Sequence, residues 1–320
     1  MDLTCLGIIL VDMFPMEIGK PLVEVEAFSP KPGGAPANVA VAAKRLGAST
    51  AFIGKVGEDL FGHWLKDILE KEGVETTGMS YAPDARTTMA FIAMPDENHA
   101  EFVFYRNPGA DTQLRESDLD VTLLQNSKAL HFDSLSLTHE RYFEASLKAI
   151  EIVKKAGGFI SFDVNYRPTM WRSPEDALQA AKAVLPLCDV VKVNETELIL
   201  LTGEPSPETG GEAILDLGGK LCLITLGEKG AYYQTRFERG YMPAFKVKTI
   251  DAIGCGDAFL GAILQQLTTY PSLTEALEAG KMEEIVRFAA AAGALTSTKR
   301  GALPAIPHRS EVEAFLSEQQ

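Results

Sequence analysis

A glycine-rich turn at residues 251–257, Asp-Ala-Ile-Gly-Cys-Gly-Asp, runs directly into an apolar segment of helical character that continues to Leu267. Glycines before a helix let backbone N–H groups converge on one point, and the helix N-terminus adds the positive end of its dipole. The turn is therefore suited to hold an anion. Asp257 would be useful there as a base for a hydroxyl that attacks a bound phosphate, whereas a lone Gly-x-Gly-Asp is more often a helix-capping acid.

A second glycine turn, Gly33-Gly34, lies before another helical segment that has Asn38 near its start. Asp12 ends the first predicted strand. At strand ends of an open parallel sheet, an Asp and an Asn that face a glycine turn can bind adjacent hydroxyls of a polyol. Taken singly, each of these residues is more often a helix cap or a turn residue.

Two further motifs follow predicted strands. Asn194 and Glu197 have the spacing Asn-x-x-Glu, which puts an amide and a carboxylate on one side of a first helical turn. Such a pair could orient magnesium-bound water beside phosphates, or form only a capping box. The run from Thr225 contains Gly227 and Gly230, which allow close backbone approach to a nucleotide, although by itself it is only a turn.

The common nucleotide-binding fingerprints are absent from the sequence. The run from Gly57 to Gly62 is followed by His63, so the lysine of a P-loop is missing. The first strand is followed by residues 12–15, Asp-Met-Phe-Pro, and not by the Gly-x-Gly-x-x-Gly turn of a dinucleotide-binding fold. If the chain holds phosphate, other groups must hold it.

Short β-rich runs alternate with helical stretches, which predicts an α/β fold with a mostly parallel central sheet and helices on both faces. We expect residues 1–320 to form a single domain. The predicted buried strands are residues 3–11, 51–56, 129–132, 159–162, 190–193 and 221–226. The helical stretches are residues 37–46, 61–72, 141–155, 174–185 and 195–201.

Two segments depart from this alternation. Residues 22–28 and 87–105 are predicted as antiparallel strands, the second pair joined by a turn at residues 95–98. We therefore expect segments 14–31 and 75–111 to form a small β-sheet, a lid that closes over a substrate and excludes water. A lid with an apolar outer face would favour a homodimer in which two lids clasp.

The charge balance limits the partners. With 44 acidic and 30 basic residues the net charge is −14, which argues against nucleic acid or an anionic membrane surface as the main partner. The N-terminus lacks a basic region, and no apolar run approaches the roughly 20 residues of a membrane helix. We therefore expect a cytoplasmic protein with no membrane partner.

Together and in this order, the motifs resemble the ribokinase-like carbohydrate kinases of the PfkB family. The resemblance covers essentially the whole chain, and it implies ATP-dependent transfer of the γ-phosphoryl group to a sugar hydroxyl. It implies Asp257 as the base and the amides of Gly254, Cys255 and Gly256 as the anion hole.

The same resemblance implies ligands at the nucleotide side of the site. It implies Mg²⁺, positioned through Asn194 and, by way of water, through Glu197. It also implies that a monovalent cation such as K⁺ is frequently present near Asp251, although Ala252 and Ile253 stand where the family commonly has threonines. The implied contacts with ATP are Asn194, Thr225, Gly227 and Gly230.

Within the family, residues 104–111, Phe-Tyr-Arg-Asn-Pro-Gly-Ala-Asp, are most similar to bacterial and plant-type fructokinases. Residues 162–168 and 298–304 fit the same group. The similarity implies that D-fructose is converted to D-fructose 6-phosphate. The implied sugar-binding residues are Asp12, Gly33, Gly34, Asn38, Arg106 and Arg167.

Two alternatives remain open at this point. A 2-keto-3-deoxygluconate kinase would use Arg106 and Arg167 to bind a carboxylate, and both arginines could also be structural ion-pair residues. A non-catalytic sugar sensor on the same fold is the other alternative, because fold alone does not fix function. The presence of Asp257, Asn194 and Glu197 weighs against a sensor.

Overall fold

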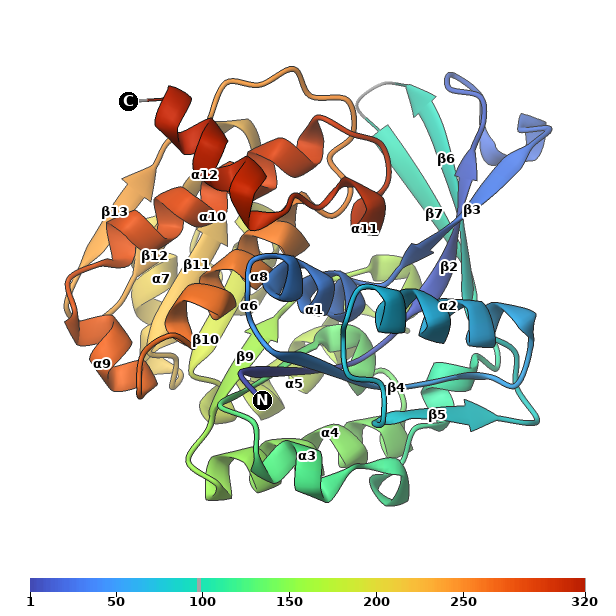
Figure 1. Cartoon of the computed structure of the whole chain (residues 1–320), viewed down its shortest axis with the longest axis horizontal. Helices are drawn as coiled ribbons and strands as arrows, with labels where there is room; N and C mark the ends of the chain where they lie inside the picture. The colour runs from blue at the N-terminus through green and yellow to red at the C-terminus, as the bar shows by residue number, and fades with distance from the viewer. Residues whose placement is uncertain (97–98, 320) are drawn as a thin grey trace.

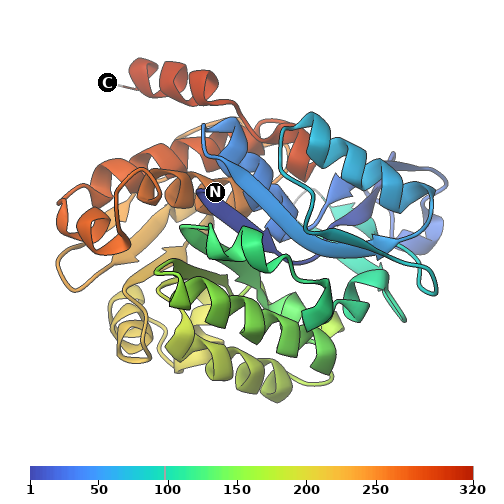
Figure 2. The same cartoon turned by 60° about the horizontal axis from the view of Figure 1, so that its bottom comes forward.

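The computed structural model describes residues 1–96 and 99–319, in which two β-sheets stand beside each other (Figures 1 and 2). The larger sheet has nine strands in the order β13-β12-β11-β10-β9-β8-β1-β4-β5, and its neighbouring strands are parallel except that β12 pairs antiparallel with both β11 and β13. The smaller sheet has the order β3-β2-β6-β7. The strands are β1 (Leu3–Leu6), β2 (Leu10–Pro15), β3 (Phe28–Gly33), β4 (Thr50–Gly57), β5 (Met79–Ala82), β6 (Met89–Asp96), β7 (His99–Tyr105), β8 (Ala129–Asp133), β9 (Phe159–Asp163), β10 (Val190–Asn194), β11 (Leu221–Thr225), β12 (Ala231–Gln234) and β13 (Arg239–Met242).

Helices cover both faces of the nine-stranded sheet (Figure 2). Residues of α1, α2, α8, α10 and α12 belong to one hydrophobic core, and residues of α3 to α7 belong to a second core. The expected α/β architecture is therefore present. The helices are α1 (Ala35–Arg45), α2 (Leu60–Lys71), α3 (Val121–Gln125), α4 (Glu140–Lys155), α5 (Pro174–Val184), α6 (Glu195–Thr202), α7 (Pro207–Asp216), α8 (Cys255–Leu267), α9 (Leu273–Glu278), α10 (Met282–Ser297), α11 (Ala302–Ala305) and α12 (Arg309–Glu318).

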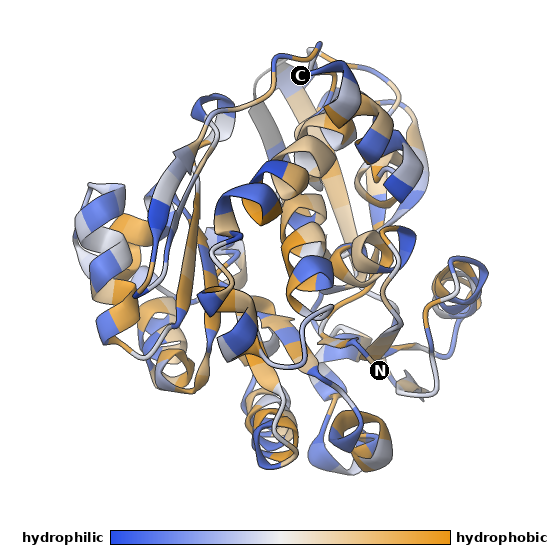
Figure 3. Cartoon of the chain, turned by 60° about the vertical axis from the view of Figure 1, so that its left-hand side comes forward, coloured by the Kyte–Doolittle hydropathy of each residue, from blue (hydrophilic) through white to orange (hydrophobic). Residues whose placement is uncertain are grey.

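Most main-sheet strands form where the sequence predicts them, because continuous apolar runs are stable when both faces are covered. Residues 51–56, 129–132, 159–162 and 190–193 lie within β4, β8, β9 and β10, and residues 221–226 overlap β11. The strands at the centre are hydrophobic along most of their length (Figure 3). No helix in the described ranges has the length and hydrophobicity needed to span a membrane.

The predicted strand at residues 3–11 is wrong in one respect, because the chain bends at Gly7 and forms two strands in different sheets. β1 pairs with β4 and β8, whereas β2 pairs with β3 and β6. Gly7 lies so close to α1 that a Cβ atom there would be 2.3 Å from the Pro36 ring. Consequently Asp12 belongs to the small sheet and not to the end of a main-sheet strand.

The predicted strand at residues 22–28 is also wrong. Leu22–Glu24 forms a short 3-10 helix after Pro21, and the strand begins only at Phe28 as β3. β3 contains Pro30 and Pro32, which lack the N–H group that a central strand needs. These prolines are tolerated because β3 lies at the edge of the small sheet.

The predicted hairpin within residues 87–105 is confirmed, since β6 and β7 pair in antiparallel register from Met89 and Tyr105. Residues 97 and 98 of its expected turn lie outside the described residues.

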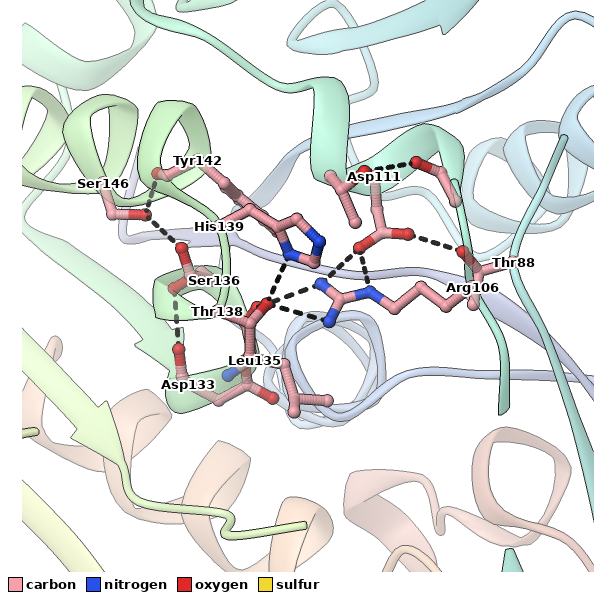
Figure 4. A network of polar contacts seen from close by, with 12 residues as sticks. Thr88, Arg106, Asp111, Asp133, Leu135, Ser136, Thr138, His139, Tyr142 and Ser146 are labelled. Atoms are coloured by element: carbon pink, nitrogen blue, oxygen red, sulfur yellow. Dashed lines mark hydrogen bonds and ion pairs between the residues drawn. The ribbon is translucent and has the colours of Figure 1, made fainter. Parts of the chain in front are cut away.

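A buried ion pair fixes the base of this hairpin (Figure 4). Arg106 directly follows β7, and its Nε donates to the Asp111 carboxylate at 2.7 Å. The same carboxylate accepts a hydrogen bond from the Thr88 hydroxyl, just before β6, at 2.5 Å. Arg106 also donates to the Thr138 hydroxyl at 2.9 Å and to the Leu135 carbonyl at 3.0 Å. Both strands of the hairpin are therefore attached to the body at one point.

This attachment predicts a specific pattern of stability. The side chains of Arg106 and Asp111 are 5% and 1% exposed, so Asp111→Asn leaves a buried guanidinium without its counter-ion. We expect the free energy of unfolding, measured with urea, to fall by about 3–5 kcal/mol. The double variant R106M/D111L removes both charges, so its free energy of unfolding should fall by less than that of Asp111→Asn.

The exposed pair Lys281 and Glu284 provides the control, because Lys281→Met should leave the urea midpoint almost unchanged. A double variant at least as unstable as Asp111→Asn would contradict the assignment of Arg106 as a buried ion-pair residue.

Candidate active site

A cleft of about 830 Å³ lies between the small sheet and the carboxyl ends of the main-sheet strands, the place where open α/β sheets bind ligands. Of the residues predicted from the sequence, those lining it are Asp12, Gly34, Asn38, Arg167, Asn194, Glu197, Thr225, Asp251, Gly254, Gly256 and Asp257. Those absent from its lining are Gly33, Arg106, Gly227, Gly230 and Cys255.

Asp257 lies in the first turn of α8 and is joined to α1 by a hydrogen bond. The side-chain amide of Asn38 donates to the Asp257 carboxylate at 2.8 Å. The two helices approach closely because Gly261 has no side chain, and a Cβ atom there would lie 2.5 Å from the Ala42 methyl group. The Asn38 Oδ1 atom is buried and has no partner among the described residues. It is therefore available to accept a hydrogen bond from a ligand hydroxyl.

Three carboxyl groups of the cleft have raised pKa values, and burial is the main cause for each, including Glu197. Burial raises the pKa of Asp257 to about 6, although the hydrogen bond from Asn38 opposes the shift. Burial and, after it, the charge of Asp257 raise the pKa of Asp12 to about 7. A base whose pKa lies near the working pH is well suited to proton transfer. Asp257 thus has both the place and the pKa of a general base.

The glycine turn before α8 presents backbone amides to the same cleft. Gly254 has a φ of 83°, and a Cβ atom there would be 2.8 Å from the Ala302 backbone, so a side chain would be strained and crowded. The first N–H groups of a helix have no partners within the helix. The Cys255 amide donates to the Ala252 carbonyl at 3.3 Å, whereas Gly256 lines the cleft. The turn therefore offers an anion-binding surface.

The second glycine turn makes room for Asp12. A Cβ atom on Gly33 would lie 1.9 Å from the Asp12 carboxylate, and one on Gly34 would lie 2.4 Å from the Ile8 carbonyl. Gly34 also has a φ of 107°, which disfavours other residues, and it precedes the first residue of α1. Gly33 therefore shapes the site without lining it.

Asn194 and Glu197 form the capping box of α6. The Asn194 side chain accepts from the Glu197 amide at 2.9 Å, and the Glu197 carboxylate accepts from the Asn194 amide at 2.8 Å. The other Glu197 oxygen accepts from the Tyr166 amide at 2.8 Å. Both residues line the cleft, so the cap is compatible with a further contact to water or a ligand. The two predicted roles, a cap and a ligand-facing pair, do not exclude each other.

The remaining predicted residues have clear local roles. Thr225 ends β11 and lines the cleft, whereas Gly227 and Gly230 belong to the following turn. Gly230 packs so closely on β13 that a Cβ atom would lie 2.0 Å from the Met242 carbonyl. The Asp251 carboxylate accepts hydrogen bonds from the amides of Ile253 at 3.0 Å and Gly301 at 2.9 Å.

Of the two predicted arginines, only one lines the cleft. Arg167 lines the cleft and lowers the pKa of both Asp12 and Asp257 by its charge. Arg106 does not line the cleft, because its guanidinium is held by Asp111, Thr138 and the Leu135 carbonyl. Arg106 was expected to bind the sugar, with a carboxylate ligand or a structural ion pair as alternatives, and its contacts are those of a structural ion-pair residue.

Several cleft residues were not predicted from the sequence. Lys192 lies in the buried strand β10, and a lysine inside an otherwise apolar run was the signal that could have revealed it. Lys248 and Arg300 add positive charge from loops. The remaining unpredicted wall is mostly apolar and includes Ile8, Leu10, Ile18, Met94, Phe102, Phe104 and Leu135.

Known proteins are similar to this one in sequence and fold over nearly the whole chain. The chain is 41% identical to fructokinase-2 of Solanum lycopersicum over 313 residues. The aligned region covers 97% of this chain and 94% of the relative. It superimposes on the Xylella fastidiosa fructokinase with bound ATP with a TM-score of 0.91, 32% identity, and coverage of 99% and 98% of the two chains.

A second solved structure is the Vibrio cholerae fructokinase in its fructose-, ADP- and calcium-bound form. Its TM-score is 0.89 at 33% identity, with 99% of each chain covered. The model of the pfkB family carbohydrate kinases matches residues 1–309. On this evidence the chain belongs to the PfkB family of carbohydrate kinases and has the ribokinase-like fold.

Proposed function

We propose that this carbohydrate kinase is a fructokinase, which transfers the γ-phosphoryl group of ATP to D-fructose and releases ADP and D-fructose 6-phosphate. One observation carries the proposal. A carboxylate with a raised pKa, Asp257, lies at a glycine-rich helix N-terminus and beside polar groups that suit a sugar, Asn38 and Asp12. The similarity to fructokinases supports fructose as the sugar.

We propose that three groups of residues bind the sugar, transfer the proton and stabilise the phosphoryl charge. Asp12 and Asn38 bind sugar hydroxyls, and Asp257 accepts the proton of the attacking hydroxyl. The amides at the start of α8 stabilise the charge on the transferred phosphoryl group. Arg167 adds positive charge at the same cleft.

ATP and a divalent metal ion are the cofactors of this kinase, and we propose Mg²⁺ as the metal. The described residues contain no group of three or more acidic, His or Cys side chains that could hold a metal by themselves. This fits Mg²⁺, which keeps several waters and binds largely through substrate phosphates, where it neutralises developing charge. Glu197 would hold one of these waters. A K⁺ ion beside the Asp251 loop belongs to the same proposal.

The contacts of Arg106 disfavour the keto-acid alternative. A 2-keto-3-deoxygluconate kinase would use Arg106 with Arg167, but the Arg106 guanidinium already binds Asp111. Asp12 would repel the acid carboxylate unless an arginine compensated. A non-catalytic sugar sensor has no need for the juxtaposition of Asn38 and Asp257 with the glycine turn.

Three further expectations stay predictions: the single domain, the cytoplasmic location and the homodimer through the lid. Exposed apolar side chains on the small sheet support the dimer. Val103 and Tyr105 of β7 are 42% and 65% exposed, and Val23 beside β3 is 92% exposed.

The role of Asp257 can be tested directly. We expect Asp257→Asn to lower kcat by about 10²- to 10⁴-fold with a modest change in the KM for fructose, because the amide cannot accept the proton. Steady-state ADP release with fructose and Mg-ATP is the measurement. A variant with near wild-type kcat would exclude Asp257 as the base.

The raised pKa predicts the acid side of the pH profile. Asp257 must be ionised to accept a proton, so kcat/KM for fructose should fall as the pH decreases through about 6. Protonation of Asp12, with a pKa of about 7, should add to the decline in the free enzyme. A profile that stays flat down to pH 4.5, in a buffer series where the protein remains folded by circular dichroism, would contradict this assignment.

A panel of acceptors tests the sugar. Fructose, glucose, ribose and 2-keto-3-deoxygluconate should be compared by kcat/KM at fixed ATP and Mg²⁺. A site built to bind a hydroxyl can discriminate by ~10⁴-fold or more against an acceptor that lacks it, so fructose should be strongly preferred. If the keto acid exceeds fructose by more than about tenfold, the fructokinase proposal is wrong.

A further inference from the structure

Lys192 stands in the middle of a strand that is otherwise apolar and buried. β10 has the sequence Val-Val-Lys-Val-Asn, and the Lys192 side chain is only 8% exposed. Lysine is almost never buried unless it is paired, because taking an ammonium out of water is costly. A lysine at this position therefore needs a counter-ion, and the cost of its burial calls for a functional explanation.

The counter-ion is Asp163 on the adjacent strand β9. The two residues are register partners, and Lys192 Nζ donates to Asp163 Oδ2 at 2.8 Å. The Asp163 side chain is 2% exposed. An ammonium has three N–H donors, and within the described part of the chain Asp163 is the one acceptor that Lys192 contacts. Two donors remain for a ligand.

The ammonium lies beneath the glycine turn of α8. Lys192 lines the cleft, and a Cβ atom placed on Gly256 would be 3.3 Å from its Nζ. Burial opposes the charged form, but the negative charges of Asp163 and Glu197 raise the pKa of Lys192, so it carries a full positive charge at neutral pH. A fixed cation thus lies next to the amides that face an anion.

We propose that Lys192 is a catalytic residue that donates hydrogen bonds to the transferring phosphoryl group, with Asp163 as the positioning residue that holds it under the glycine turn. The proposal rests on the kinase function argued above. The attacking sugar oxygen bonds to the γ-phosphorus, the bond to the β,γ-bridging oxygen breaks, and ADP leaves. The hydroxyl proton goes to Asp257, and Lys192 keeps its protons and stabilises charge only.

A second buried ion pair supplies a matched control. Lys55 on β4 binds Asp118 at 2.8 Å with side chains that are 7% and 13% exposed, and it does not line the cleft. Lys192→Met and Lys55→Met therefore remove equivalent buried lysines. If Lys192 had only a structural role, both variants would show the same losses of nucleotide affinity and of kcat.

Nucleotide binding provides the first test, using the non-hydrolysable ATP analogue adenylyl imidodiphosphate and ADP with Mg²⁺ in calorimetry. Lys192→Met should weaken binding of the analogue by more than tenfold and binding of ADP by less than threefold, because only the analogue has a γ-phosphoryl group. Lys55→Met should change neither. Equal weakening of the two nucleotides by Lys192→Met, or no weakening, would overturn the proposed contact.

Kinetics provide the second test. Lys192→Met should lower kcat by about 10²- to 10³-fold with the fructose KM changed less than threefold, and Lys192→Arg should recover part of the loss. Lys55→Met should keep kcat within threefold of wild type. If Lys192→Met retains wild-type kcat, the catalytic role is wrong.

The tests of Lys192 still give an answer if a variant does not fold or if the proposed sugar kinase activity is absent. If Lys192→Met does not fold because Asp163 is left unpaired, the double variant K192M/D163N removes both charges and is measured in its place, with the same expectations. If the wild-type protein phosphorylates none of the sugars tested, the proposed function fails while the nucleotide-binding comparison still decides the role of Lys192.

Discussion

Repulsion between negative charges is the constraint on which the rest of the site depends. In the proposed reaction, a carboxylate base must remain ionised beside a bound polyphosphate in a chain whose net charge is −14. Two unit charges 4 Å apart interact by about 4 kcal/mol at an effective dielectric constant of ~20, so this repulsion cannot be neglected. The α8 amides, Arg167 and Lys192 all lie at the same cleft and counter it. In the protein itself, the hydrogen bond from Asn38 and then the charges of Lys192 and Arg167 oppose the effect of burial, so the Asp257 pKa of about 6 still allows ionisation at neutral pH.

The separation of the chain into two sheets places two carboxyl groups of the cleft on different elements. The bend at Gly7 carries Asp12 into the small sheet, whereas Asp257 is fixed in α8 against α1. Asp12, which we propose binds the sugar, and Asp257, the proposed base, therefore stand on different elements, a strand of the small sheet and the helix α8. The distance between the Asp12 and Asp257 carboxylates therefore depends on how the small sheet is placed against α8.

The sequence predicted those parts of the site whose signals are local. The turn before Asp257 and the Asn194 capping box are helix N-termini, whose chemistry depends on a few consecutive residues. The contacts of Lys192 and Arg106 could not be derived in this way, and the sugar-binding role expected for Arg106 is not supported, because these side chains bind partners that only the tertiary structure brings close. For the same reason, the apolar run at residues 3–11 gave no indication that Gly7 meets α1 and divides the strand.

The Arg106 ion pair links the position of the lid to the shape of the cleft. Its guanidinium binds the Leu135 carbonyl, and Leu135 also lines the cleft beside Phe104 of β7. The base of the hairpin and one wall of the sugar site are therefore fixed by the same segment. Water competes with the sugar as an acceptor of the phosphoryl group, and a closed apolar wall disfavours it. Arg106 thus contributes to the shape of the cleft through Leu135, although its own side chain does not line the cleft.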